Sequence, residues 1–245
     1  MENWFTHFGT ELLGTFILII LGNGIVANVV LKNTKGNNAG WLSITIGWSF
    51  AVIIGATIAS ALKGAAHLNP AVTIAFVVNG WEKNIGSLGL IPIFIIGQLI
   101  GAILAQIVID IFYIKHITNS ISDNKNNNVL AMHSTGPQYR NIFSNFFCEF
   151  FATLILVVGI FSLSNWFSSA TWMGPIFVGF IVLAIGLSLG GTTGYAINPF
   201  RDLCPRIVHQ LLPLKGKSNS DWSYSWIPVV APMLAGIMGG ALFLI

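Results

Sequence analysis

Charged residues are scarce in this chain: its 245 residues include 11 Lys and Arg and 8 Asp and Glu, which together make 8% of the sequence. Soluble domains carry about 25% charged residues, which cover the folded core in water. Hydrophobic residues instead make up 54% of the sequence. The composition therefore argues against a soluble globular domain and predicts a protein whose surface faces lipid.

Cysteine is also rare, and the two cysteines, Cys148 and Cys204, lie in apolar surroundings. We interpret them as packing residues, so we expect neither a disulfide framework nor a metal site. The formal net charge of +3 is small and spread over loops, which argues against nucleic-acid binding. An early basic cluster is missing as well, so we expect no cleavable leader before the first long apolar run.

Long apolar runs are abundant. A helix of about 20 apolar residues crosses the hydrocarbon core of a bilayer, which is about 30 Å thick. Six runs of that length occupy residues 8–30, 40–62, 86–113, 142–164, 172–193 and 223–245, joined in places by polar connectors at 31–40, 116–128 and 214–223. Two further apolar stretches, 67–78 and 197–212, are too short to cross. The pattern predicts an all-α membrane protein with six transmembrane helices and two half-membrane helices.

Each short stretch contains an Asn-Pro pair near its start. Proline suits the first turn of a helix, where its missing N–H has no intrahelical partner, and asparagine is a good cap just before it. A helix that begins inside a membrane directs unpaired N–H groups and the positive end of its dipole at whatever lies there. The residues of the two motifs are Asn69, Pro70, Ala71, Asn198, Pro199 and Phe200.

The two halves of the chain repeat one pattern. TELLGTFILIILGNG at 10–24 is similar to CEFFATLILVVGI at 148–160, and a glutamate, Glu11 or Glu149, opens each apolar run. Three spans per half is an odd number, so the halves must enter the membrane in opposite orientations. Inverted repeats with paired broken segments indicate a central polar pathway. We therefore expect one channel domain, 1–245, with repeats at about 8–113 and 142–245 joined by a polar loop at 114–141.

These motifs resemble the aquaporin, or major intrinsic protein, family, and within it the bacterial glycerol facilitators. The residues that carry the resemblance are TKGNNAGW at 34–41, HLNPAVTI at 67–74, and GYAINP followed by RDLCPR within 194–206. The resemblance covers nearly the whole chain. It implies an aquaporin-like bundle with one pore per subunit, a homotetramer, and a cell-membrane location with both termini in the cytoplasm. That orientation leaves most loop lysines outside, against the positive-inside rule, and we give the resemblance more weight.

The resemblance makes Asn69 and Asn198 the two pore asparagines. Each would cap its half-helix and direct an amide N–H at passing oxygen atoms, which interrupts the hydrogen-bonded chain that a proton needs. Two positive dipole ends would also repel cations. Taken alone, either asparagine could equally be a plain helix cap.

By the same resemblance, Trp48, Gly186, Tyr195 and Arg201 form the selectivity constriction. A charge at membrane depth is costly and marks function, and the guanidinium fork of Arg201 can hold two neighbouring hydroxyl groups. Gly186 stands where water-only members place a histidine, so we expect it to widen the gap. Tyr195 stands where facilitators have phenylalanine, and offers both an apolar ring and a hydroxyl.

The position of Trp48 is open at this point. Its spacing from Asn69 is about one residue longer than the family pattern, and one residue turns a helix by about 100°. A rigid count would bring Ser49 to the pore instead. An extra residue accommodated near Lys63 and Gly64 would restore Trp48, which is the placement we expect.

Five residues are expected to support the pore. Asp202 and Arg206 have the i,i+4 spacing of an ion pair, which would shape the loop beside the constriction. Glu11 and Glu149 are implied to accept backbone N–H groups of the loops before the half-helices, and a proton relay is the weaker alternative. His67 is expected to be a hydrogen-bonded structural residue, although a pH-sensitive role is the other possibility.

Three residues depart from the family pattern. Phe200 stands where alanine is usual, and the sequence leaves open whether it packs away from the pore or narrows it. Cys204 stands where glycine is common. Asp110 replaces an aromatic residue near the end of the third span, and we interpret it as a solvated cap beside Tyr113 and Lys115.

The predicted function is a passive channel for glycerol, similar small neutral solutes and water, which excludes ions and protons and has no catalytic residue, metal or cofactor. The alternatives are a mainly water-selective channel and a gradient-coupled secondary transporter, for which few ionisable side chains are available. An intramembrane enzyme is disfavoured, since the His-Ser neighbours at 133–134 lie in a polar connector and no metal-ligand spacing occurs. Expected partners are the permeants, the lipid bilayer and further copies of the chain.

Overall fold

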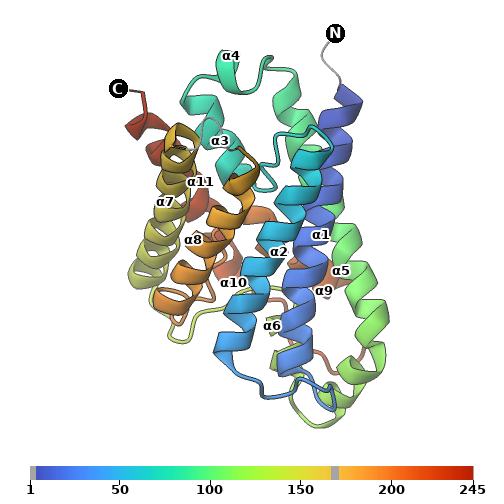
Figure 1. Ribbon diagram of the computed structural model, residues 1–245. Coiled ribbons are helices and arrows are strands. Elements are labelled where there is room, and N and C mark those ends of the chain that lie inside the picture. Colours follow the sequence, from blue (N-terminus) through green and yellow to red (C-terminus); the bar gives the residue numbers. More distant parts are fainter. Residues whose placement is uncertain (1–3, 167–170, 245) are drawn as a thin grey trace.

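The computed structural model describes residues 4–166 and 171–244, and every regular element in these ranges is a helix (Figure 1). The elements are α1 (Trp4–Val30), α2 (Trp41–Ala61), α3 (Pro70–Val78), α4 (Trp81–Asn84), α5 (Leu90–Ser122), α6 (Asn126–Ala131), α7 (Ile142–Trp166), η1 (Thr171–Met173), α8 (Gly174–Ser188), α9 (Pro199–Leu211), α10 (Trp222–Ser225) and α11 (Ile227–Leu242). The all-α fold class is confirmed, and α3 and α9 are the two short helices that follow the Asn-Pro pairs.

Five helical stretches among the described residues are long and apolar enough to cross a membrane: α1, α2, α5, most of α7, and α10 with α11 together. The predicted fifth span is shorter than expected, because α8 has 15 residues and ends at Ser188, while 189–193 form turns. Gly190 lies in this turn, where a Cβ would overlap the ring of Tyr195. Tyr195 thus packs back against the end of α8.

The predicted third span is too short. Helix α5 continues to Ser122, so the first part of the expected connector at 116–128 is helical. His116 Nδ1 lies 2.9 Å from the carbonyl oxygen of Lys32, and the Ser120 hydroxyl accepts a 3.0 Å hydrogen bond from the Lys32 N–H. These contacts tie the extra turns of α5 to the end of α1, which the local polar composition did not indicate.

The two halves of the chain are interlocked. Helix α1 packs against α2 and α5, and α7 packs against α8 and α11, but each half-helix packs on the other half: α3 on α11 and α9 on α5. Close approach of α3 to α11 requires glycine, because a Cβ on Gly236 or Gly240 would overlap the carbonyl oxygen of Ala71 or Ala75. The arrangement brings the starts of α3 and α9 together inside the bundle.

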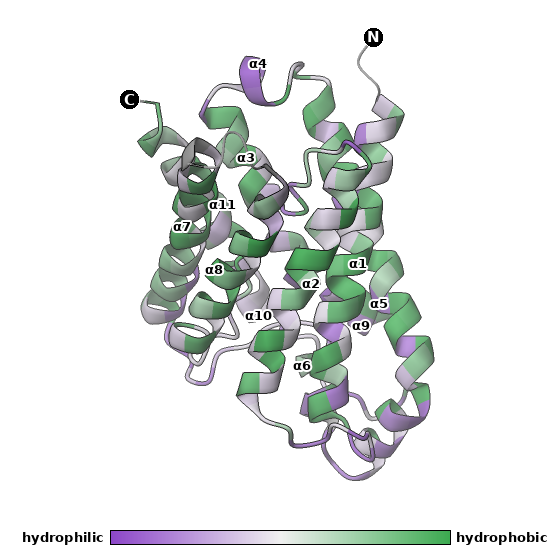
Figure 2. Cartoon of the chain, viewed as in Figure 1, coloured by the Kyte–Doolittle hydropathy of each residue, from purple (hydrophilic) through white to green (hydrophobic). Residues whose placement is uncertain are grey.

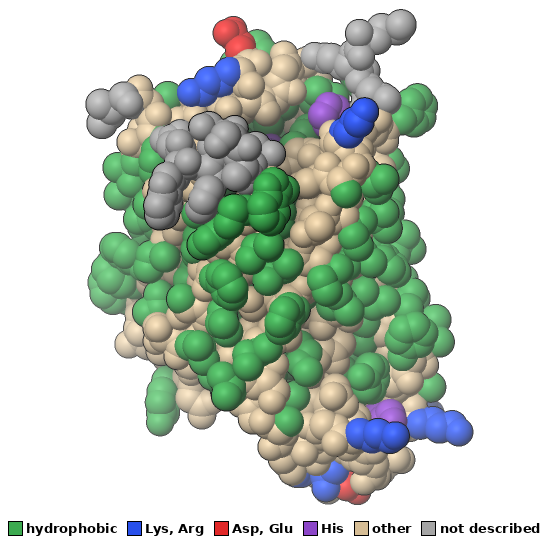
Figure 3. Space-filling model, in the orientation of Figure 1, with side chains coloured by type: hydrophobic (Ala, Val, Ile, Leu, Met, Phe, Trp, Pro, Cys, Tyr) green, Lys and Arg blue, Asp and Glu red, His purple; other side chains and the backbone are tan. Residues whose placement is uncertain are grey.

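The outer surface is an apolar band with polar ends. Hydrophobic residues dominate the long helices, and charged side chains on the visible face gather at the two ends of the bundle (Figures 2 and 3). Large apolar side chains such as Phe112 and Phe143 are exposed on this band. Both termini lie at the end of the bundle that carries α4 (Figure 1). A surface of this kind is suited to lipid along the helices and water at the ends.

Candidate functional site

The two half-helices begin with the same cap. The Asn69 side-chain oxygen accepts a 2.9 Å hydrogen bond from the N–H of Ala71 at the start of α3. The Asn198 side-chain oxygen accepts from the N–H groups of Phe200 and Arg201, at 3.0 and 3.3 Å, at the start of α9. Both asparagines have extended backbone before a proline in the first turn. Each pair therefore starts a helix as the sequence predicts.

The amide groups of the two asparagines cross over to the opposite loop. Asn69 Nδ2 donates to the carbonyl oxygen of Ile197 at 2.8 Å, and Asn198 Nδ2 donates to the carbonyl oxygen of Leu68 at 2.8 Å. This reciprocal pair determines which amide atom is nitrogen. An amide nitrogen has two hydrogens, so each asparagine keeps a second donor for a molecule in the cavity that both residues line.

The loops before the two caps have an unusual backbone that is the same in both halves. Ala66 and Leu68 have φ values of 55° and 53°, and Tyr195 and Ile197 have 40° and 44°. Left-handed backbone costs a residue with a side chain about 1–2 kcal/mol. Such backbone strain persists only where surrounding contacts compensate for it.

Two fully buried glutamates provide these contacts. Glu11 in α1 accepts the N–H groups of residues 67–68, each at 2.8 Å, one on each carboxylate oxygen. Glu149 in α7 accepts those of residues 196–197 in the same way, each at 3.0 Å. Gln98 of α5 donates a further 2.8 Å hydrogen bond to Glu11. The carboxylates thus hold the loops that position both caps.

A cavity of about 300 Å³ runs past the two caps. Its polar lining is concentrated on a few side chains, and the apolar remainder comes from α1, α2, α3, α7, α8 and the loops before the two caps. The polar or aromatic residues that line it include Trp48, His67, Asn69, Tyr195, Asn198 and Arg201. An apolar cavity with a few converging polar groups is typical of a site for a small molecule.

Trp48 and Arg201 meet in this cavity. The guanidinium carbon lies 4.3 Å from the centre of the indole ring, within the range of a cation–π contact. Both side chains are buried, at 4% and 6% exposure. The ring packs where Gly22 of α1 has no side chain, since a Cβ there would overlap it. The indole Nε1 of Trp48 is buried and has no hydrogen-bond partner among the described residues.

Ser49 points elsewhere: its hydroxyl donates a 2.8 Å hydrogen bond to the carbonyl oxygen of Gly179 in α8. After α2 ends at Ala61, Lys63 adopts left-handed backbone with φ of 64°. Trp48 rather than Ser49 lines the cavity, as we expected.

Gly186 makes room for Tyr195 instead of leaving a gap. A Cβ on Gly186 would lie 2.9 Å from Cζ of Tyr195 and 3.1 Å from its hydroxyl oxygen. Trp41 supports the same ring: its Nε1 donates to the Gly186 carbonyl oxygen at 3.0 Å, and the two rings meet edge to face at 5.7 Å. The space that the missing side chain opens is thus occupied by the ring tip of Tyr195, whose hydroxyl has no partner within the described part of the chain.

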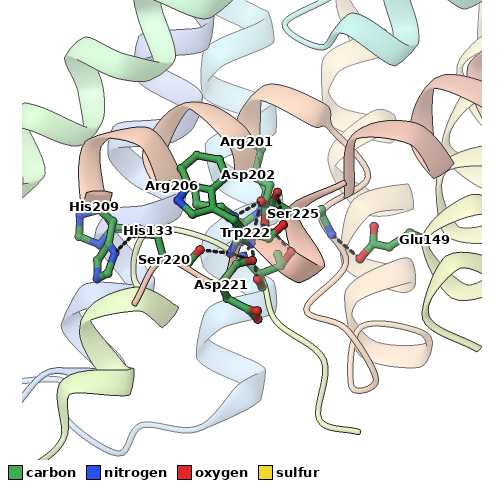
Figure 4. A network of polar contacts seen from close by, with 12 residues as sticks. His133, Glu149, Arg201, Asp202, Arg206, His209, Ser220, Asp221, Trp222 and Ser225 are labelled. Carbon is green, nitrogen blue, oxygen red and sulfur yellow. Dashed lines mark hydrogen bonds and ion pairs between the residues drawn. The ribbon is translucent and has the colours of Figure 1, made fainter. Parts of the chain in front are cut away.

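Asp202 and Arg206 form a buried ion pair one turn apart on α9, with 2.8 Å between nitrogen and oxygen. The second oxygen of Asp202 accepts from the N–H and hydroxyl of Thr135, at 2.7 and 2.6 Å. Arg206 donates to the carbonyl oxygens of Thr135 and Ser220, at 2.8 and 2.7 Å. Figure 4 shows this cluster, and Glu149 lies to one side of it. The pair fastens two loops onto α9 directly beside Arg201.

The expectation that Asp110 is a solvated cap is wrong. Helix α5 runs on to Ser122, and Asp110 is 5% exposed. His133, which the sequence placed in a polar connector, is fully buried, with Nε2 3.0 and 3.1 Å from the two carboxylate oxygens of Asp110. Gln106 donates to Asp110 at 2.9 Å.

Sequence reasoning missed Asn23 and Gln106, two fully buried amides in α1 and α5. A signal was present, since polar side chains within apolar spans are expensive and therefore functional or tightly paired. The recognised Asn-Pro motifs lie in the loops and half-helices, whereas Asn23 and Gln106 lie inside the long apolar helices. Asn23 accepts a hydrogen bond from Arg201 at 3.4 Å and donates to Gln106 at 2.7 Å.

The remaining candidates pack around the site. Phe200 packs against the main core and does not belong to the cavity lining among the described residues. Cys204 is fully buried. His67 lies at the cavity, with its ring 4.7 Å from that of Phe76 in a parallel stack and its Nδ1 3.2 Å from the Thr73 hydroxyl.

Comparison with known proteins agrees with this geometry. The family model described as "Major intrinsic protein" matches residues 2–243. A probable glycerol uptake facilitator protein of Thermotoga maritima is 43% identical over 237 residues, which cover 95% of this chain and 96% of the relative. The glycerol uptake facilitator protein of Bacillus subtilis is 42% identical over 242 residues, which cover 97% and 84%.

Among solved structures, the X-ray structure of the aquaglyceroporin from Plasmodium falciparum superposes with a TM-score of 0.83 at 30% sequence identity. The match covers 98% of this chain and 96% of that one. Together with the paired half-helices and crossed asparagines, these matches show that the chain belongs to the major intrinsic protein family.

Proposed function

We propose that the protein is a passive membrane channel for glycerol, similar small neutral solutes and water. The observation that carries the proposal is the meeting of Arg201 with two aromatic residues, Trp48 and Tyr195, in a cavity that also contains both Asn-Pro caps. The names of the relatives, which are glycerol uptake facilitators, support the same solute.

A polyol has a carbon edge and a hydroxyl edge, and the cavity offers a surface for each. The rings of Trp48 and Tyr195 would face the carbon edge. The guanidinium of Arg201 would donate to neighbouring hydroxyl groups with its planar fork.

Exclusion of protons and cations would arise at the caps. Asn69 and Asn198 each keep one amide hydrogen for the permeant, so an oxygen passing between them would accept from both. An oxygen that only accepts cannot relay a proton, and two helix starts direct positive dipole ends at the same point. The buried charge of Arg201 would add to the barrier for cations.

A gradient-coupled transporter fits these contacts less well, and no covalent step is expected. The buried carboxylates of Glu11 and Glu149 both accept pairs of backbone hydrogen bonds that hold strained loops. A carboxylate with this role is poorly placed to take up and release a transported proton.

We extend the proposal to inverted repeats at about 8–113 and 142–245, a homotetramer, and a cell-membrane orientation with both termini in the cytoplasm.

The test is stopped-flow light scattering on proteoliposomes. An inward glycerol gradient should cause fast shrinkage as water leaves, followed by reswelling faster than that of empty liposomes. Flux should rise linearly with concentration and be independent of proton and sodium gradients. Fast shrinkage without faster reswelling would instead identify a water-selective channel, with Tyr195 closing the space beside Gly186. Saturable, gradient-dependent flux would identify a transporter.

A further inference from the structure

Three buried polar side chains are connected to Arg201 by a series of hydrogen bonds and lie outside the cavity lining. Asn23 in α1 and Gln106 in α5 are fully buried, and Asp110, one turn after Gln106, is 5% exposed. None of the three belongs to the cavity lining of the described residues. Polar groups inside a membrane span are costly unless they are fully hydrogen-bonded, so this set calls for an explanation.

The three side chains form a hydrogen-bonded series with one direction. Arg201 Nη1 donates to Asn23 Oδ1 at 3.4 Å, Asn23 Nδ2 donates to Gln106 Oε1 at 2.7 Å, and Gln106 Nε2 donates to Asp110 Oδ1 at 2.9 Å. An ionised carboxylate only accepts hydrogen bonds. It therefore requires the NH₂ of Gln106 to face it, so the oxygen of Gln106 must face Asn23. The oxygen of Asn23 must then face Arg201.

His133 holds the far end of the series in place. Its Nδ1 lies 2.6 Å from the carbonyl oxygen of Val129, an acceptor only, so Nδ1 carries a hydrogen. Its Nε2 lies within 3.1 Å of both oxygens of Asp110. The carbonyl oxygen of His133 also accepts from Asn23 at 3.0 Å. Its ring meets that of His209 edge to face at 5.0 Å, and Figure 4 shows the two side by side.

We propose that Asp110 is a positioning residue for the pore: it sets the direction of the Gln106 amide, which together with the His133 carbonyl group holds Asn23, and thereby aims the guanidinium of Arg201. Without a fixed acceptor at position 110, Gln106 can turn by 180° and bring its NH₂ against that of Asn23, which displaces the Asn23 oxygen that accepts from Arg201. The inference rests on the proposed channel function. Asp110 itself would not touch the permeant.

The competing explanation is that the series only holds α1, α5 and the 129–135 segment together. The two explanations differ in what they change. A purely structural role would lower the amount of folded protein and its thermal stability, but would leave the selectivity of each folded channel unaltered. A positioning role would alter selectivity, because the fork of Arg201 would no longer match two polyol hydroxyl groups.

The experiment compares Asp110→Leu with Asp110→Asn in proteoliposomes, with permeabilities normalised to incorporated protein. Asparagine keeps an oxygen for Gln106 and can donate its NH₂ to His133 Nε2, so it should restore the geometry that leucine removes. We expect the ratio of glycerol to water permeability to fall about fivefold in Asp110→Leu and to remain near the wild-type ratio in Asp110→Asn. Gln106→Met should behave like Asp110→Leu, and it provides a second route if the leucine variant fails to fold.

Asn79→Leu is the matched control. Asn79 is a buried amide at the end of α3, where it donates to the carbonyl oxygen of Phe243 at 2.8 Å, far from Arg201 in the hydrogen-bond network. Its loss should lower stability and leave the permeability ratio unchanged. An unchanged ratio in Asp110→Leu and Gln106→Met, or an equal change in Asn79→Leu, would overturn the positioning role.

Proton leak is measured on the same vesicles, because the charge of Arg201 opposes it whichever solute passes. A wild-type channel that fails to conduct glycerol would overturn the proposed function alone. In that case a higher leak in Asp110→Leu than in Asp110→Asn would still support the aiming of Arg201, and equal leaks would overturn it.

Discussion

The guanidinium of Arg201 lies over the ring of Trp48, with 4.3 Å from its central carbon to the ring centre. Both side chains are almost fully buried, so the ring covers a charge that has left water. A cation–π contact contributes about 2 kcal/mol or more when it is desolvated. In the channel that we propose, Trp48 would therefore have two roles, as an apolar wall and as the partner that keeps Arg201 in place.

Replacing Trp48 should therefore lower glycerol permeability more than replacing its neighbour Ser49 does. Trp48→Leu keeps an apolar wall but removes the ring, and we expect the glycerol permeability to fall about tenfold, as for the loss of about 1.4 kcal/mol. Ser49→Ala is the control, because Ser49 bonds to the Gly179 carbonyl and faces α8. Stopped-flow reswelling of both variants measures the difference. Equal loss in the two would show that the helix, and not the ring, determines the rate.

The space beside Tyr195 gives a second prediction. Gly186→Ala introduces a Cβ 2.9 Å from the tyrosine ring, so the ring must move toward the cavity. We expect slower glycerol flux with water flux less affected, because glycerol needs the wider opening. Gly191→Ala is a matched control, since a Cβ there meets nothing within 4 Å. Adding Tyr195→Leu to Gly186→Ala should restore glycerol flux, and failure to do so would place the obstruction elsewhere.

The features that were predicted well from the sequence depend on residues close together in the chain or on the family resemblance. An Asn-Pro pair after an apolar run specifies its own helix start, and the i,i+4 spacing of Asp202 and Arg206 lets them pair on one helix face. Glu11 and Glu149 were assigned their backbone partners through the family resemblance. The helix caps and the ion pair each lie within one motif, and the glutamate contacts, which join distant segments, were supplied by the resemblance.

The features that the sequence did not predict depend on contacts between helices. The series from Arg201 to Asp110 joins α9, α1 and α5, and no spacing in the sequence connects these residues. The end of α5 extends because His116 and Ser120 find partners at the end of α1. Gly186 was expected to leave an opening, but whether a missing side chain leaves space depends on which neighbour fills it.

Glu149 gives a prediction about stability. Glu149→Gln keeps one acceptor but places an NH₂ against a backbone N–H of residues 196–197, which both donate to the carboxylate. Leaving a buried donor unpaired costs about 1–3 kcal/mol, so thermal unfolding in detergent should occur at lower temperature. Glu149→Leu leaves both donors unpaired and should lower it further. Identical unfolding temperatures for the two variants would argue against the hydrogen bonds as the cause.

The loop before α10 gives a prediction about pH. Although partial burial by itself would raise the pKa of Asp221, hydrogen bonds from Arg140 and Ser223 hold that pKa below its ordinary value. A lowered pKa in the folded state contributes stability above the unfolded value, and this stability is lost as the pH falls through the folded value. Because the Arg140 side chain is 65% exposed, Arg140→Ala should lower stability by less than about 1 kcal/mol. Unfolding at pH 7 should show the loss, and the difference between the variant and the wild type should shrink as the pH falls below the ordinary aspartate pKa.

The hydroxyl of Tyr195 gives a prediction about stability that is separate from glycerol flux. This hydroxyl is buried and has no partner among the described residues, a state that costs about 1–3 kcal/mol. Tyr195→Phe should therefore raise the unfolding temperature, and should leave glycerol flux unchanged because the hydroxyl packs beside Gly186. The Tyr224 hydroxyl is also buried without a partner in the described chain, but Tyr224 does not line the cavity. Tyr224→Phe should thus raise stability without changing flux. A slower glycerol rate in Tyr195→Phe alone would contradict this packing and show that the Tyr195 hydroxyl contacts the permeant.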